Sequence, residues 1–361
     1  MKALIFALAT ALPQFSTDQN NIAQHIINLC QLRDHSAKSI ESLFLKTGIA
    51  KRYSVLKDFQ SPLEEATLFN KNFLEFVPGT QQRNDIYIKE APKLALAAAQ
   101  KAITMWGRPA QEITHIISVS CTGVMAPGIE FILQNELGMR DDVQRLGINF
   151  MGCFGAFKGL AIATAIAKEN PSTRVLVVCT ELCTLHFQIS VKPEVLVGNA
   201  LFADGSAAVI IGCNKLPEEN SLWSIEKSGS CALKNSQDKM TWVASNHGLV
   251  MTLARDVPKI IETEAPKAIS KFLENIDYKN LIWAIHPGGK AIVEAIEHSY
   301  NLNKEQTASS WEVLKNYGNM SSATFLFVLD DLLKNKQHNK DTVGIGFGPG
   351  LSLEMILLGT N

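Results

Sequence analysis

Short runs of apolar, largely β-branched residues alternate along this chain with longer stretches that are typical of helices. The apolar runs predict buried strands at 113–119, 174–179, 207–212, 281–285, 343–347 and 353–358. The stretches between them predict helices at 90–107, 153–168, 257–274, 290–300 and 321–334. Because strands that alternate with helices usually form a parallel sheet covered on both faces, the pattern predicts an α/β fold.

The first residues allow two interpretations. A lysine at position 2 followed by the apolar run 3–12 resembles a short signal peptide, although no small-x-small cleavage site follows. A buried first strand that ends at Pro13 accounts for the same residues, and we favour it. Elsewhere no uninterrupted apolar run approaches the ~18 residues that a membrane span requires.

Two similar segments suggest that the architecture is duplicated. Phe-Ala-Asp-Gly at 202–205 precedes the strand 207–212, and Phe-Gly-Pro-Gly at 347–350 precedes the strand 353–358. Two halves that each run strand, helix, strand, strand would place a site between the copies. The polar stretch 217–238 separates them, so we expect an N-terminal half at 1–220 and a C-terminal half at 221–361.

Composition excludes several classes of function. The formal net charge is −1, which provides no field to hold nucleic acid or an anionic membrane. The seven cysteines include no recurring CxxC pair with metal-ligand spacing, so we expect no metal site. Free thiols in a reducing compartment are the simplest explanation, and we therefore expect a cytoplasmic protein.

Cys153 is the cysteine with the most distinctive surroundings. It lies between two glycines, after a short apolar strand and before an Ala-rich helix. A thiol at a helix N-terminus has a lowered pKa because the unpaired N–H groups stabilise the thiolate. A small buried residue is the alternative for Cys153, and we expect that role for the other six cysteines.

Two polar residues occupy comparable junctions in the second half. His286 follows the strand 281–285 and precedes Pro-Gly-Gly, at the end of a strand where α/β folds usually bind ligands. Asn319 precedes the helix 321–334 and is either a helix cap or a neutral donor to an oxygen that gains charge. A histidine that satisfies a loop carbonyl or a helix end remains the alternative for His286. A thiol, an imidazole and an amide together suffice for thioester chemistry.

Four motifs carry a resemblance to a known family. GCFGAF at 152–157, HPGG at 286–289, YGNMSSA at 317–323 and GFGPGL at 346–351 resemble the type III polyketide synthases, which are chalcone synthase-like enzymes. The resemblance implies a thiolase-like duplicated five-layer α/β/α/β/α fold and a homodimer. It also implies that Cys153 is the nucleophile and that His286 and Asn319 form the oxyanion hole. The substrates would be an acyl-CoA starter and malonyl-CoA, with no metal or redox cofactor.

The resemblance extends to further residues of the site. Phe202 matches the gate between the coenzyme A tunnel and the cavity, and Met251 replaces a second gate aromatic. Family positions that line the cavity are held here by Cys121, Thr122, Ala126, Cys183, His186 and Ser321. Positions along the coenzyme A site are held by Lys46, Lys51, Arg52, Gly288, Gly289 and Ala291. A solvated charged face is the alternative for the three basic residues.

The cavity residues differ from those of the plant enzymes, and the chain begins almost at its first strand, so we expect a bacterial member. His186 should shrink or polarise the cavity, whereas the flexible Met251 should admit a longer acyl group. We expect an alkylpyrone or alkylresorcinol product. Three alternatives remain: a ketoacyl-ACP synthase III-like enzyme that extends once, a papain-like cysteine hydrolase, and a non-catalytic acyl-CoA-binding protein.

Overall fold

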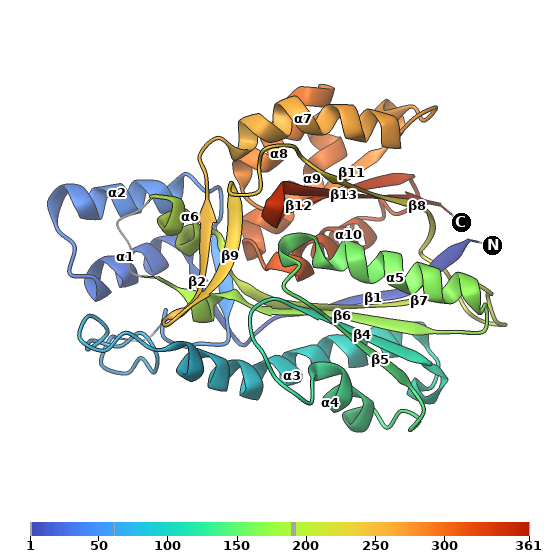
Figure 1. Cartoon of the computed structure of the whole chain (residues 1–361), viewed down its shortest axis with the longest axis horizontal. Coiled ribbons are helices and arrows are strands. Elements are labelled where there is room, and N and C mark those ends of the chain that lie inside the picture. The colour runs from blue at the N-terminus through green and yellow to red at the C-terminus, as the bar shows by residue number, and fades with distance from the viewer. Residues whose placement is uncertain (1, 61, 189–192, 361) are drawn as a thin grey trace.

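The computed structural model describes residues 2–60, 62–188 and 193–360. Within these residues nine strands form one mixed sheet (Figure 1). From one edge to the other the strands are β5 (Gln144–Asn149), β4 (His115–Ser120), β6 (Val175–Leu182), β7 (Asp204–Gly212), β1 (Ala3–Ala11), β8 (Trp223–Ala232), β13 (Ser352–Gly359), β12 (Thr342–Gly348) and β11 (Ile282–Ile285). The pairs β4–β5, β4–β6 and β11–β12 are parallel, and the other neighbours are antiparallel.

The sheet folds back over a central helical layer, so that five layers lie on one another (Figure 1). The outer layer below β4–β7 contains α3 (Thr80–Trp106) and α4 (Ile129–Glu136). The central layer contains α5 (Gly155–Glu169) and α10 (Thr324–Lys334), with α9 (Lys304–Tyr317) beside α10 and β11. The outer layer above β12–β13 contains α7 (Val257–Phe272) and α8 (Lys290–Tyr300). This α/β/α/β/α order is the one that the resemblance implied.

Buried apolar side chains fill the spaces between the layers. One cluster lies between α3 and the sheet, a second surrounds the central helices, and a third lies under α7 and α8. In the second cluster Phe157 of α5 stacks on Phe325 of α10, with ring centroids 4.1 Å apart. The two helices that follow Cys153 and Asn319 are therefore packed directly against each other.

The remaining elements gather at one end of the layered body, at the left of Figure 1. They are α1 (Gln19–Leu29), α2 (Asp34–Leu45), α6 (Pro193–Leu201), the pair β2 (Phe15–Asp18) and β3 (Lys51–Ser54), and the hairpin β9 (Met240–Ser245) and β10 (Gly248–Leu253). The sequence analysis predicted none of these elements. They matter because they supply most of the walls around the candidate site.

The predicted strands are all present, and residues 3–11 form β1, between β7 and β8. The polar stretch 217–238, however, contains the strand β8. β8 pairs with β1 on one side and β13 on the other, so backbone hydrogen bonds run without interruption between the two halves.

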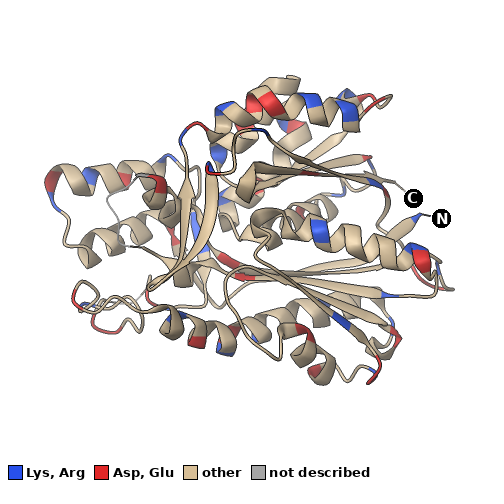
Figure 2. Cartoon of the chain, viewed as in Figure 1, with Lys and Arg blue, Asp and Glu red and all other residues tan. Residues whose placement is uncertain are grey.

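Charged residues of both signs interleave over the outer helices (Figure 2), in keeping with a net charge near zero. None of the helices in the described ranges combines the length and the apolar character that crossing a bilayer demands.

Candidate active site

Cys153 lies in a tight turn at the start of α5. The turn, Gly152–Phe154, connects the end of β5 to the helix and buries the thiol. Gly152 has a φ of +70°, and a Cβ there would lie 2.5 Å from Cδ of Pro349. Only glycine fits this position without strain, and its presence lets the GFGPGL motif close over the cysteine.

Asn319 is held so that its side-chain amide lies beside the Cys153 thiol. Its Oδ1 accepts a hydrogen bond from the backbone N–H of Ser321 at 2.8 Å. Its Nδ2 donates to the carbonyl oxygen of Gly288 at 3.1 Å, and both Nδ2 and Oδ1 lie 3.9 Å from Cys153 Sγ. The amide oxygen thus accepts from the following turn, and the amide nitrogen keeps a second N–H that can serve as a donor in the cavity.

His286 stands at the end of β11, where its backbone N–H donates to the carbonyl oxygen of Ile345 at 2.7 Å. The ring is almost fully buried, and neither nitrogen has a hydrogen-bond partner among the described residues. A histidine that satisfied a loop carbonyl would show such a bond. Instead His286 lines a cavity of about 380 Å³ together with Cys153 and Asn319. The structure thus brings the three predicted residues together.

Burial decides the protonation of this site. It raises the pKa of the Cys153 thiol to about 11, against hydrogen bonds to Ser321 and Asn319 that lower it. It also lowers the pKa of the His286 imidazole to about 3. The sequence analysis expected a lowered thiol pKa, and this expectation was wrong because loss of water outweighs the helix N-terminus. A neutral thiol and a neutral imidazole therefore line the same cavity, and among the described residues no hydrogen bond joins them.

A wide cavity of about 1140 Å³ leads from the surface to the catalytic cavity. The two share Leu201, Leu253, Gly288 and Ile292 as walls. Four of the residues assigned to coenzyme A line the wide cavity, namely Lys46, Gly288, Gly289 and Ala291. Two further cations, Arg255 and Lys290, line it as well.

On its inner side the catalytic cavity continues into a smaller one of about 300 Å³. Phe202, Met251 and Cys153 line both. Four predicted cavity residues, Cys121, Thr122, Cys183 and Ser321, line the smaller cavity. Phe202, Met251 and Cys183 also line a third cavity of about 610 Å³, where His186 lies.

Two residues of the site were missed from the sequence. Glu181 is fully buried and accepts hydrogen bonds from Cys121 N at 3.0 Å and Thr122 Oγ1 at 2.9 Å, and burial raises its pKa. A carboxylate two residues after the apolar run 174–179 was a signal for it. Trp242 lies on the unpredicted strand β9, and its Nε1–H donates to the carbonyl oxygen of Cys121 at 2.7 Å.

Three assignments need correction. The Arg52 side chain is buried, and its guanidinium donates to the carbonyl oxygens of Asn199 and Phe202, so it lines the third cavity rather than the surface mouth. Lys51 does not line the mouth either, because its amine lies over the Tyr53 ring, 5.5 Å from the centroid. Ala126 is exposed and, within the described part of the chain, lines none of these cavities.

Comparison with known proteins agrees with this geometry. Residues 1–215 match the model of the N-terminal domain of chalcone and stilbene synthases, and residues 225–360 match the model of their C-terminal domain. The chain belongs to the chalcone and stilbene synthase family. Membership confirms the resemblance that the four motifs carry.

Relatives of this family member include "Probable polyketide synthase 1" of Dictyostelium discoideum, which is 32% identical over 360 residues. The match takes in 98% of this chain but only 11% of that relative's length.

Solved structures similar to this family member confirm the thiolase-like fold. The C-terminal type III polyketide synthase domain of Steely1, a type I/III hybrid from Dictyostelium, matches with a TM-score of 0.94 at 31% identity. The match covers 100% of this chain and 99% of that one. PKS-I from the brown alga Ectocarpus siliculosus matches with a TM-score of 0.90 at 26% identity, over 100% and 98% of the two chains.

Proposed function

We propose that this protein is a type III polyketide synthase that loads an acyl-CoA starter on Cys153 and extends it repeatedly with malonyl-CoA. The product then cyclises to an alkylpyrone or alkylresorcinol. The observation that carries the proposal is the convergence of Cys153, His286 and Asn319 on one cavity, which continues to a surface cavity with three cations at its walls.

Loading begins when the Cys153 sulfur attacks the thioester carbonyl of the starter. His286 takes the thiol proton, and the tetrahedral oxygen is stabilised by donors that face the sulfur. The C–S bond to coenzyme A then breaks, and the leaving thiolate takes the proton from His286. The imidazole is neutral before attack, so a ring nitrogen is free to accept the proton, but burial makes it a weaker base than a free imidazole. The transfer therefore accompanies C–S bond formation and does not precede it.

Extension uses the same donors at a different oxygen. When malonyl-CoA loses carbon dioxide, the electron pair of the broken C–C bond moves to the thioester oxygen and forms an enolate. Asn319 Nδ2–H and an N–H of His286 stabilise that oxygen. The enolate carbon attacks the Cys153 thioester, the C–S bond to Cys153 breaks, and a chain two carbons longer leaves on coenzyme A.

The cavities suggest where the two ends of the substrate lie. Lys46, Arg255 and Lys290 are suited to the phosphates of coenzyme A at the mouth. The low bulk of Gly288, Gly289 and Ala291 suits a narrow pantetheine arm. Phe202 and Met251 line the catalytic cavity and both inner ones, and this shared position supports assigning them as gate residues. The product would be set by the space beyond them.

We also propose that the enzyme is a homodimer that joins through β5, and that it works in the cytoplasm. β5 is an edge strand, and the exposed apolar residues Leu146, Phe150 and Met151 lie on it or just after it. An exposed apolar edge readily pairs with another chain. Seven free thiols favour a reducing compartment. Light scattering should give a molar mass of two chains for the wild type and of one chain for the Leu146→Lys variant. A wild-type monomer would refute this part.

The test of function mixes the protein with malonyl-CoA and starter acyl-CoAs of different chain lengths and identifies the products by mass spectrometry. Cyclic pyrones or phenols support the proposal, a linear β-ketoacyl product supports a single-extension enzyme, and binding without turnover supports a non-catalytic protein. Cys153→Ala should abolish condensation yet keep slow malonyl-CoA decarboxylation. Asn319→Ala should reduce that decarboxylation about 10²–10³-fold. Full product from Cys153→Ala would refute the nucleophile.

A further inference from the structure

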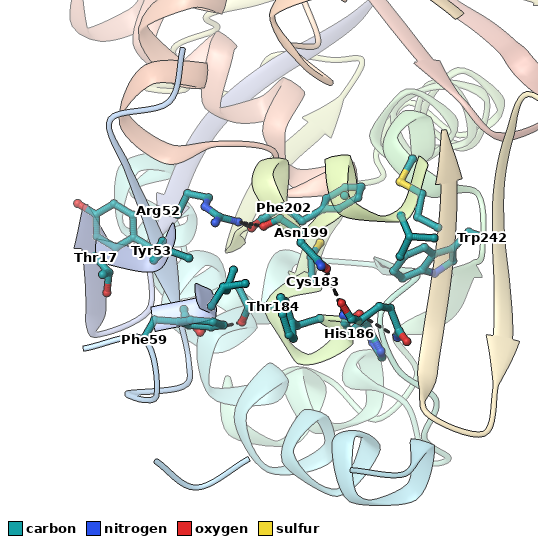
Figure 3. A pocket seen from close by; sticks show the side chains of 18 residues that line it. Thr17, Arg52, Tyr53, Phe59, Cys183, Thr184, His186, Asn199, Phe202 and Trp242 are labelled. Atoms are coloured by element: carbon teal, nitrogen blue, oxygen red, sulfur yellow. Dashed lines mark hydrogen bonds between the residues drawn. The ribbon is translucent and has the colours of Figure 1, made fainter. Parts of the chain in front are cut away.

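The third cavity is a chamber built mainly from elements outside the catalytic layers. Ile22 and Ile26 of α1, Phe59 and Phe187 give it an apolar wall. Figure 3 shows Arg52, Tyr53 and Phe59 on one side and Trp242 on the other, with Phe202 at the top between them. Since Phe202, Trp242 and Cys183 also line the cavity next to Cys153, the chamber is the inward continuation of the catalytic site.

Most polar groups in the chamber wall already have protein partners. His186 Nε2–H donates to the carbonyl oxygen of Thr122 at 2.8 Å, and its Nδ1 accepts from Leu249 N at 3.1 Å. Asn199 exchanges two hydrogen bonds with the backbone of Gln188. Thr184 Oγ1 donates to Asp204 at 2.7 Å. These groups therefore do not require a ligand.

Arg52 is the exception. It is 5% exposed, and its Nε and Nη1 donate to Gln19 Oε1 and to the carbonyl oxygens of Asn199 and Phe202. Its Nη2 has no hydrogen-bond partner among the described residues, although the charge of the buried Asp204 raises the pKa of Arg52 against the effect of burial. The pKa of Arg52 falls to about 9 through burial, so the guanidinium still carries its charge at neutral pH.

A buried charged donor without an acceptor is costly, whereas a hydrogen bond to a charged group is among the stronger ones. The chamber therefore combines an apolar wall with one N–H donor, Arg52 Nη2, that lacks an acceptor among the described residues. A plain hydrocarbon chain would contact the apolar wall but leave Nη2 unpaired. A chain with an oxygen near its far end would contact the wall and also accept a hydrogen bond from Nη2.

We propose that this chamber receives the far end of the starter acyl group and selects chains that end in an oxygen acceptor, which Arg52 Nη2 binds. The proposal rests on the polyketide synthase function and names the class of starter. It predicts a preference for ω-hydroxyacyl over plain alkyl starters of matched length, at the length that reaches Arg52.

The direct test measures binding without turnover. Calorimetric titration of the Cys153→Ala protein would compare ω-hydroxyacyl-CoA with plain acyl-CoA at six, eight and ten carbons. We expect the hydroxylated chain to bind about 10-fold more tightly at one of these lengths. Equal or weaker binding of the hydroxylated chain at all three lengths would overturn the proposal.

A matched pair of variants locates the site. Thr17 and Arg52 are paired across β2 and β3, and both line the chamber. Thr17→Trp should fill the chamber and lower kcat/KM for the preferred starter at least about 10-fold. Ser16→Trp, one residue earlier on the same strand and outside the chamber wall, should leave it unchanged. Equal effects of both variants would contradict the assignment.

Arg52→Lys keeps the charge but loses the planar donor, so the preference for the hydroxylated chain should disappear. Thermal unfolding checks whether the Arg52→Lys variant folds. If it does not fold, the calorimetric titration and the comparison of Thr17→Trp with Ser16→Trp still test the chamber proposal.

If no starter, acetyl-CoA included, gives a malonyl-dependent product, the synthase function fails while the titration still tests the chamber. If products form without a preference for oxygen, only the chamber proposal fails.

Discussion

Phe202 and Asn319 are joined by an isolated parallel β-bridge. The Asn319 N–H donates to the carbonyl oxygen of Leu201, and the Ala203 N–H donates to the carbonyl oxygen of Asn319, both at 2.9 Å. Phe202, the proposed gate residue, follows α6 in the first half of the chain, and Asn319, the proposed oxyanion donor, follows α9 in the second. Because only backbone atoms form this bridge, it positions the catalytic amide whatever side chain stands at position 202.

Phe202→Leu should therefore separate gating from catalysis. Malonyl-CoA decarboxylation, which we assign to His286 and Asn319, should change by less than about threefold. The range of accepted starters should broaden, because a smaller side chain opens the passage between the cavities that Phe202 lines. Decarboxylation is followed by carbon dioxide release, and starter range by competition between acyl-CoAs. A large loss of decarboxylation would show that the ring itself holds the amide.

Strands and helices whose own residues show an apolar run or a bounding turn were predictable from the sequence. β6 and β7 are buried along their whole length, and the apolar runs 175–179 and 207–211 within them marked both strands. α8, with its Gly-Gly turn before it, has the predicted bounds. β8 was missed because beyond Ile225 its residues are largely polar and alternate with exposed positions. Such a strand is defined by its neighbours β1 and β13 rather than by its own composition.

The same distinction applies to the site. Cys153, His286 and Asn319 could be predicted from the sequence because each lies near a glycine at the junction before a predicted helix. The direction of the Arg52 side chain could not be predicted from the sequence. Lys46, Lys51 and Arg52 are consistent with one charged face until β3 pairs with β2, which turns Arg52 inward. Trp242 enters the site only through the β9–β10 hairpin, whose position depends on tertiary packing.

The raised thiol pKa predicts how Cys153 reacts with iodoacetamide. Below a pKa of about 11 the thiolate fraction, and with it the alkylation rate, should rise about tenfold for each pH unit between pH 7 and pH 9. Mass spectrometry of the peptide that contains residue 153 gives the rate. A rate that is already constant over this range would show a preformed thiolate–imidazolium pair and refute the neutral pair.

The buried histidines predict a loss of stability in acid. The folded-state pKa of His286 is about 3 and that of His186 about 4, both below the ordinary value of 6.5. Between these values and pH 6.5 only the unfolded chain binds the proton, so the stabilisation is complete above pH 6.5 and decreases as pH falls. At pH 5 each histidine should cost roughly 2 kcal/mol of unfolding free energy.

Urea titration at pH 7 and pH 5 measures this loss. His286→Leu removes one titrating ring that has no side-chain hydrogen bond among the described residues, so it should reduce the pH-dependent loss by roughly 2 kcal/mol. His298→Leu, at an exposed position of α8, should retain the full loss. Identical pH dependence in wild type and His286→Leu would contradict a neutral buried imidazole.

Gly152 and Gly107 allow backbone strain to be separated from crowding at the active site. Both have left-handed φ values, +70° and +75°, so alanine should cost each variant about 1 kcal/mol of stability. At Gly107 the new Cβ meets no atom within 4 Å, whereas at Gly152 it meets Pro349 at 2.5 Å and must displace the turn that holds Cys153. We therefore expect Gly152→Ala to lower kcat about 10²-fold and Gly107→Ala to leave it unchanged. Equal activity in the two variants, at equal melting temperatures, would mean that the position of the sulfur does not depend on this contact.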